Sequence, residues 1–389
     1  LVRGLDPPPE PSARTIQANH PRKVRPLSPF TPTAAAELAG PDWLRARRAR
    51  AAEAFEASTL PSAEEEVWRY SRIGDLDLAA FGPVAAGSPG HTSSVGEVPA
   101  EWTAQGVVVA PASTLSEEVA GLGTVAGAGP DVFALLNDAF AADPLVVSVP
   151  RGVVLDEPIR IEQVFTGPGV AVFPRLVVRL AEGAQATVVD HVTSTGGPVL
   201  SVPLTELDLA RGARLRYAHV QDLGPDAWQI GSLVARVGQE ADLAAGLVGL
   251  GGSYARIRTD CTLAGRGANG DLLAAYFGSG DQTLDFRTFQ HHDAPDTTSN
   301  LLFKGAVGGR SRSVYTGLIR VDKAARGTNA FQTNRNVKLS DSAWAESVPN
   351  LEIETNDVRC SHASTVGPVD AEQRFYLESR GVPPRVADR

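Results

Sequence analysis

Apolar and polar residues alternate in one segment after another from Gly152 onward. Val, Ile, Leu and Tyr occupy many of the apolar positions, and this two-residue period is typical of half-buried β-strands. The clearest examples are GVVLDEPIRIEQVF, PRLVVRLAEG, QATVVDHVTS, RLRYAHVQDL, GSLVARVG and RSVYTGLIRV. Almost no helical period interrupts them, so the pattern predicts a mainly β protein folded as a sandwich, a barrel or a solenoid.

A recurring turn separates these segments and favours the solenoid. The connectors AEGAQAT, ARGARLR, GQEADLA and GRGANGD contain Gly183, Gly212, Gly238 and Gly267, which are 26 to 29 residues apart. Such a spacing is typical of stacked coils, each of which buries its apolar row against the next. The repeat predicts a parallel β-helix over residues 105–356. It leaves open a large antiparallel sandwich whose hairpin turns resemble one another.

The chain before this region has a different period. Residues 1–40 are rich in proline and poor in large apolar side chains, which predicts a disordered leader. Residues 41–82 predict a helical segment, because apolar residues recur at helical spacing after Asp42. A second helix start is predicted at Ser62, since Glu65 occupies the capping-box position three residues later.

A stretch rich in Gly, Pro and Ser follows the helical segment. The sequence GPVAAGSPGHTSSVGEVP begins at residue 82 and contains several turn signals. We therefore expect a linker over residues 83–104, with His91 as a solvated loop histidine.

Composition and charge narrow the functional classes. The net charge is -9, which argues against nucleic-acid binding because that function usually requires a basic surface. The one basic run, RARRAR at residues 45–50, is flanked by acidic residues and predicts a solvated helix face. No apolar run is long enough to span a membrane, and the start has no apolar core of a signal peptide. We expect a cytoplasmic protein whose two cysteines, Cys261 and Cys360, form no disulfide framework.

Methionine is absent from the sequence, and the first residue is Leu. We therefore expect either that the native start lies elsewhere or that methionine positions are missing from the sequence.

Candidate chemistry lies near the end of the chain. Cys360 and His362 stand two residues apart in DVRCSHASTVGP, which follows a predicted strand, LEIET. Asp370 and Gln373 predict the start of a helix after it, so we expect a polar loop between the two elements. In an extended segment residues i and i+2 point to the same side, so the thiolate and the imidazole could reach one metal ion.

These two residues alone do not make a metal site. A structural zinc ion needs four ligands, and no CxxC or HxxxH pattern lies nearby. His291 and His292 form the only other histidine cluster, in a predicted loop, and neighbours in a strand would point to opposite faces. Chemistry alone therefore favours an inert pair, a small buried thiol beside a hydrogen-bonding histidine. A nucleophilic Cys360 would need a base held by a third group.

Three long blocks change this assessment. They are YFGSGDQTLDFRTFQHHDAPDTTSNLLFKGAV, YTGLIRVDKAARGTNAFQTNRNVKLS and VPNLEIETNDVRCSHASTVGPVDAEQRFYLESRG. Together they resemble the SufB/SufD family of iron-sulfur cluster assembly proteins over most of residues 130–385. The segment P-x-x-x-E-E-x-W-R-Y at residues 61–70 and the scarcity of cysteine resemble the SufD branch.

The resemblance implies a fold, partners and a site. The fold is a right-handed parallel β-helix with small N- and C-terminal helical segments. The partners are a SufB-like subunit and a SufC-like ABC ATPase that docks on the C-terminal helices, and the cofactor is a transient iron-sulfur cluster shared with the SufB-like chain. The family motif falls on Cys360 to Thr365, so His362 is the implied metal-site residue at the partner interface and Cys360 a weaker candidate.

The same resemblance bears on the end of the chain and on catalysis. The family continues beyond GVPPRVADR into a further docking helix, so residues 357–389 are expected to be an interface loop and a shortened helical segment. No Walker A sequence occurs, so we expect a partner to use the ATP. The interpretation is a non-enzymatic scaffold subunit of the SUF system, which could form a homodimer when isolated.

Two alternatives remain from the sequence. One is a β-helix polysaccharide hydrolase or lyase, in which carboxylates along one groove act as acid and base. Its candidate residues are Asp281, Asp285, Asp293 and Asp296. The other is a purely architectural partner of SufB, in which Cys360 and His362 have no ligand role.

Overall fold

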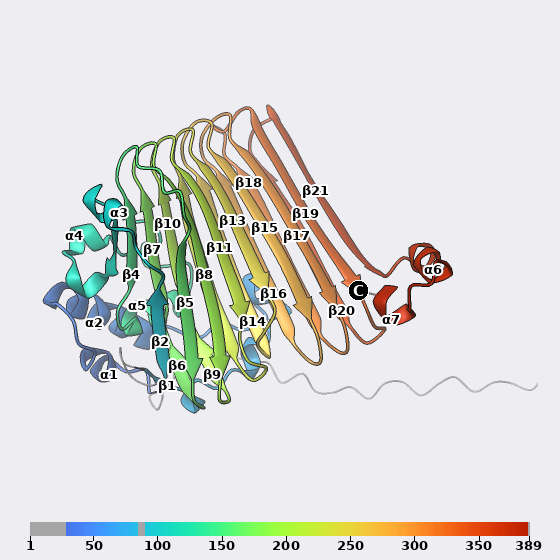
Figure 1. The fold of residues 1–389 in the computed structure, drawn as a ribbon, viewed down its shortest axis with the longest axis horizontal. Coiled ribbons are helices and arrows are strands. Elements are labelled where there is room, and N and C mark those ends of the chain that lie inside the picture. Colours follow the sequence, from blue (N-terminus) through green and yellow to red (C-terminus); the bar gives the residue numbers. More distant parts are fainter. Residues whose placement is uncertain (1–28, 85–89, 388–389) are drawn as a thin grey trace, which may run out of the picture.

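The chain winds into a parallel β-helix built from two long sheets (Figure 1). The computed structural model describes residues 29–84 and 90–387. Successive coils place one strand in each sheet, so neighbouring strands within a sheet belong to successive coils. The predicted solenoid is therefore confirmed, and the antiparallel sandwich is wrong, because parallel ladders join β5 (Ile159–Thr166) and all the later strands of its sheet.

The strands of the two sheets follow in spatial order. One sheet consists of β20 (Trp344–Ile353), β18 (Arg312–Val321), β16 (Thr283–His292), β14 (Tyr254–Leu263), β12 (Trp228–Val237), β10 (Leu204–Leu209), β7 (Arg175–Leu180), β4 (Leu145–Val149) and β3 (Val108–Pro111). Short strands extend it, namely β1 (Gly82–Pro83), β6 (Val170–Val172) and β9 (Val199–Ser201). The other sheet consists of β2 (His91–Val95), β5, β8 (Gln185–Thr195), β11 (Arg214–Asp222), β13 (Asp242–Gly249), β15 (Asn269–Gly278), β17 (Thr298–Val307), β19 (Thr328–Lys338) and β21 (Val358–Pro368).

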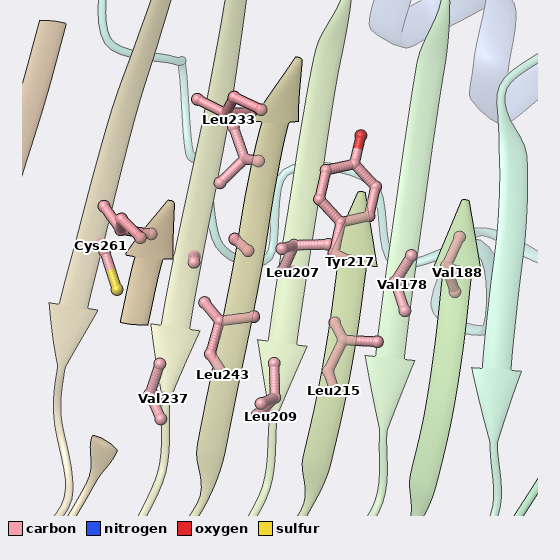
Figure 2. Packing of buried hydrophobic residues seen from close by; sticks show 14 of the residues in the cluster. Val178, Val188, Leu207, Leu209, Leu215, Tyr217, Leu233, Val237, Leu243 and Cys261 are labelled. Atoms are coloured by element: carbon pink, nitrogen blue, oxygen red, sulfur yellow. The ribbon is translucent and has the colours of Figure 1, made fainter. Parts of the chain in front are cut away.

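The interior of the middle coils is apolar. Figure 2 shows side chains such as Leu207, Tyr217 and Leu243 from both sheets meeting in one interior. The register explains the packing, because paired positions of parallel strands place their side chains on the same face, as in Leu209 beside Val237. Each buried leucine contributes about 1.5–3 kcal/mol relative to an exposed one, so stacked apolar rows hold successive coils together.

The turns between coils only partly follow the predicted glycines. Gly212 adopts a positive φ of 63°, as a tight left-handed turn requires. Gly238 does not, and Glu240, with a φ of 55°, takes that conformation two residues later. Gly238 is required for a different reason, because a Cβ there would lie 2.7 Å from the Leu209 carbonyl oxygen.

Short helices gather at the start of the solenoid (Figure 1). They are α1 (Pro32–Ala36), α2 (Asp42–Glu56), α3 (Ala100–Ala104), α4 (Glu117–Ala120) and α5 (Val132–Phe140), with 3₁₀ turns at Glu66–Trp68, Ile73–Asp75, Leu78–Ala80 and Ala112–Thr114. Beyond the other end of the solenoid lie α6 (Ala371–Ser379) and α7 (Pro384–Ala387). Within residues 29–84 and 90–387, no helix combines the length and the apolar character needed to cross a membrane.

The folded part begins within the predicted leader. Residues 1–28 lie outside the described residues, but Phe30 is buried edge-on against Phe140 and Phe173. Helix α1 follows, capped by the Thr31 side chain. The expectation of little structure up to residue 40 is therefore wrong from Phe30 onward, because one buried aromatic residue anchors a proline-rich stretch.

The second predicted helix does not form. The capping bond is present, since the Ser62 N–H donates to Glu65 Oε1 at 2.9 Å, but only the 3₁₀ turn Glu66–Trp68 follows. Trp68 is buried, and the Arg256 guanidinium lies 3.9 Å from its ring centroid. This contact with the solenoid, which sequence periodicity does not reveal, replaces the continuation of a helix.

The predicted linker over residues 83–104 contains regular structure. Strand β2 pairs antiparallel with β5, and α3 follows. His91 is not a solvated loop residue, because it lies on β2 with its Nε2 3.3 Å from Gln163 Oε1 and its ring edge-on to Phe165. Burial lowers the pKa of its imidazole.

The long parallel ladders of the solenoid begin at β4, later than residue 105. Between residue 105 and β4 the chain forms strand β3 and helices α4 and α5, and β3 pairs antiparallel with β4.

The basic run on α2 is more than a solvated helix face, because Arg48 is fully buried. Its guanidinium donates to the carbonyls of Leu38, Ala39, Ala141 and Ala142, and burial lowers its pKa to about 10.

Candidate functional site

The last coil leaves one end of the β-helix open. Strands β20 and β21 are the final strands of the two sheets, and no described strand pairs with the outer edge of either. Most residues of β21 are exposed, and Figure 1 shows it at the end of the stack. An unpaired strand edge of this length presents a row of free backbone donors and acceptors to a partner.

Cys360 and His362 lie on this end strand. The prediction of a polar loop over DVRCSHASTVGP is wrong, because Val358–Pro368 pairs in parallel with β19 along its whole length. The hydrogen-bond partners are some 30 residues earlier in the chain, so the polar composition of the segment gives no sign of them.

The two residues point to the same side, as predicted. Cys360 pairs with Ala330 and His362 pairs with Gln332, and both partners are buried inward-facing residues of β19. Since paired positions of a parallel ladder share a face, the thiol and the imidazole lie over the open end of the interior. His362 is exposed.

The environment of Cys360 makes it the weaker ligand. Its side chain packs against an apolar cluster that contains Ile319, Val321 and Ala330. Burial raises the pKa of the thiol, so the protonated form dominates at neutral pH in the absence of a metal. The other cysteine, Cys261, is fully buried, and burial raises its pKa to about 12.

The histidine pair upstream does not supply a further ligand. His291 and His292 end strand β16 and are not in a loop. His292 is buried and hydrogen-bonds to Thr297 Oγ1 at 2.8 Å and Ser299 Oγ at 2.9 Å, and burial lowers its pKa to about 4. Among the described residues, no group of three or more His, Cys, Asp or Glu side chains could hold a metal ion.

The interior changes character toward the open end. The Tyr276 hydroxyl donates to Asn336 Oδ1 at 2.8 Å and accepts from Asn334 Nδ2 at 3.0 Å. Gln332 is also buried on this inner face, directly beside His362 in the ladder. These residues were not singled out in the sequence, although the alternation A-x-Q-x-N-x-N in NAFQTNRNV marks an unusual polar row at inward positions.

The aspartates that suggested a hydrolase have structural partners. Asp285 is fully buried between Arg256 and Arg287, and Asp281 pairs with Arg310 at 2.6 Å. Asp296 pairs with Arg266 at 2.7 Å. Asp293 is exposed, and partial desolvation together with Asp322 raises its pKa. Ion pairs thus account for three of the four carboxylates.

The C-terminal helix has an exposed apolar surface. As predicted, α6 begins after Asp370, whose carboxylate accepts from the backbone N–H groups of Glu372 and Gln373. No residue of α6 is buried, and Phe375 is 71% exposed. Tyr376 and Leu377 are exposed beside it, and so is Val386 on α7.

The sequence of the chain matches known proteins of one family. The match to the family described as SUF system FeS cluster assembly, SufBD core domain, covers residues 163–389. The chain belongs to the SufBD family. The match contains all the strands from β8 to β21, including the end strand with Cys360 and His362.

Individual SufBD proteins are similar over a longer range. The chain is 34% identical to an iron-sulfur cluster assembly SufBD family protein of Mycobacterium bovis over 346 residues, which cover 87% of this chain and 83% of the relative. It is 25% identical to a SufBD family protein of Synechocystis over 86% of the chain and 82% of the relative. It is 30% identical to the iron-sulfur cluster assembly protein SufD of Escherichia coli, over 65% of the chain and 61% of the relative. Membership supports a role in iron-sulfur cluster assembly.

Proposed function

We propose that this chain is a SufD-type scaffold subunit on which an iron-sulfur cluster is assembled together with a SufB-like partner. His362 supplies a ligand to that cluster. The observation that carries the proposal is the position of His362, exposed on the end strand β21 and directed over the open end of the β-helix. A ligand in this place is accessible to a second chain.

The open end suits a site divided between two chains. This chain offers one imidazole and a weaker thiol, and a cluster needs further ligands. A partner strand pairing with the outer edge of β21 would satisfy its free backbone groups and bring its own ligands to the same place. In the absence of the SufB-like subunit, the same edge could pair with a second copy of this chain to form a homodimer.

The chemistry suits a cluster that must later leave. Iron-sulfur clusters are usually held by thiolates, and a neutral imidazole in place of one thiolate changes the charge and the potential of the cluster. The cluster is the cargo of the complex, and this chain binds and orients it without carrying out a catalytic step of its own. We therefore propose a scaffold and not an enzyme.

The exposed surface of α6 suits the ATPase. Phe375 and Tyr376 form an exposed apolar patch on α6, and such a patch is typical of a surface that a partner covers. A SufC-like ABC ATPase docked there would supply the ATP hydrolysis, since this chain has no Walker A sequence. A cytoplasmic location stays a prediction.

Co-purification with the SufB-like and SufC-like partners tests the ligand role. The His362→Ala and His291→Ala variants are compared after anaerobic reconstitution, and His291, a partly exposed histidine on β16, serves as the control. We expect all complexes to form and only His362→Ala to lose bound iron and sulfide. Equal amounts of bound iron and sulfide in both variants would favour the second candidate function, in which this chain is a purely architectural partner.

A further inference from the structure

One buried side chain beside His362 has no hydrogen-bond partner. Gln332 on β19 is 1% exposed, and neither its Nε2 nor its Oε1 is paired among the described residues. Leaving a buried polar atom unpaired destabilises the fold, because the atom loses its hydrogen bonds to water without replacement. A glutamine with both amide atoms unpaired therefore lowers the stability of the fold relative to a leucine, which would fill a similar volume at this position.

The position of Gln332 is fixed by its neighbours. A Cβ at Gly317 on β18 would clash with the Gln332 amide and lie 2.6 Å from the Tyr315 hydroxyl. Only glycine leaves room there, so the absence of a side chain on β18 makes space for the amide. Tyr315 itself shares a hydrogen bond with Thr288 at 3.1 Å.

The neighbouring polar side chains already have hydrogen-bond partners. Asn334 Nδ2 donates to the Tyr276 hydroxyl, and Asn336 Nδ2 donates to Asn334 Oδ1 at 2.7 Å. Gln332 differs from them because its ladder partner toward the open end is His362. Neighbouring strands of a sheet are about 4.8 Å apart, which places an imidazole within reach of a glutamine amide on the same face.

We propose that Gln332 is a positioning residue for His362. Its Oε1 accepts the N–H of one imidazole nitrogen when the partner covers the open end, and the lone pair of the other nitrogen then faces the cluster. Metal-binding histidines usually donate their second N–H to such an acceptor, which fixes the tautomer and the ring orientation. This inference rests on the proposed ligand role of His362.

The test compares Gln332→Leu with a matched control, Gln290→Leu. Gln290 on β16 is also fully buried with an unpaired Oε1, but it does not pair with His362. The first measurement is NMR of the imidazole nitrogens in the complex without iron, with this chain labelled with ¹⁵N-histidine and His362→Ala used for assignment. We expect one His362 tautomer in the wild type and in Gln290→Leu, and a mixture in Gln332→Leu.

The second measurement is retention of iron against a chelator. We expect Gln332→Leu to bind iron about 10- to 100-fold more weakly, the usual effect of removing an outer hydrogen bond to a metal ligand. Gln332→Glu, which keeps an acceptor oxygen, should restore the single tautomer. Gln332→Met replaces the leucine variant if that variant does not fold.

Two outcomes overturn the inference. One is an unchanged His362 tautomer in Gln332→Leu, and the other is undiminished iron retention in that variant while His362→Ala loses iron. Both are distinct from failure of the proposed function, which would appear as full iron retention in His362→Ala. In that case the NMR comparison still reports whether Gln332 orients the imidazole.

Discussion

Single residues at the open end have distinct roles because their surroundings differ. His362 is exposed on a strand edge, whereas Cys360, two residues earlier, packs into an apolar cluster. The sequence predicts that both point to the same side, since this follows from the geometry of an extended chain. It does not predict their different burial or the pairing of His362 with Gln332 in the ladder, because these depend on residues of earlier coils.

Cysteine reactivity follows from this burial. Because burial raises the thiol pKa of Cys360, we expect iodoacetamide to modify this residue slowly at neutral pH. The reaction should become faster as the pH rises toward and above the usual pKa of a cysteine thiol. Cys261 should be modified only after unfolding. Mass spectrometry of the native chain over a pH series measures both rates. Rapid modification of Cys360 at pH 7 would contradict this account.

At the scale of elements, the end strand and the helix after it form the part of the molecule most open to partners. The sequence predicts α6 correctly, because its cap at Asp370 is local. It predicts a loop in place of β21, because a strand in a parallel sheet is stabilised by partners distant in the sequence. The unpredicted strand β2 in place of a linker has the same physical reason, since its partner β5 begins at Ile159.

Removing the aromatic patch should affect one partner only. We expect Phe375→Ser to weaken retention of the SufC-like ATPase by about tenfold or more, because truncating an aromatic anchor typically costs about 2 kcal/mol or more. The SufB-like subunit should stay bound. Phe331→Ser is the control, since Phe331 is 43% exposed on β19. Pull-down with titrated ATPase measures the effect, and equal loss in both variants would count against an α6 docking site.

At the scale of the whole molecule, repeated coils make the architecture predictable. The turn spacing and the two-residue period indicate the solenoid, because each coil repeats the same packing. The N-terminal segment before the solenoid has no repeated packing, and the sequence gives little sign of how this segment packs on the strands. Arg287 donates to the Arg69 carbonyl at 2.6 Å, and Arg256 donates to the Val67 carbonyl at 3.2 Å. Asp285 holds both guanidinium groups in place.

This buried cluster predicts a pH-dependent stability. Burial would raise the pKa of Asp285, but Arg287 and Arg256 outweigh it and hold the pKa below its usual value. A depressed pKa stabilises the fold above the unfolded value of about 3.9, and this stabilisation is lost as the pH falls through the folded value. We expect Asp285→Asn to lower the free energy of unfolding by about 3–5 kcal/mol at pH 7, because it leaves buried cations unpaired.

Denaturant unfolding of the wild type and Asp285→Asn across a pH series checks this prediction. The difference between the two proteins should shrink below about pH 4. Asp281→Asn is the control, because the Asp281 pair with Arg310 is exposed and a surface ion pair contributes little to stability. A small, pH-independent effect of Asp285→Asn would show that the cluster does not anchor the N-terminal segment.

The most direct test of the account is whether a nitrogen of His362 binds the cluster. Pulsed EPR on the reduced, reconstituted complex, with only this chain labelled with ¹⁵N-histidine, detects such a nitrogen by its hyperfine coupling to the cluster. The account predicts a ¹⁵N coupling in the wild type and in His291→Ala that is lost in His362→Ala. A cluster without this coupling in the wild type, or with an unchanged coupling in His362→Ala, would contradict the ligand role.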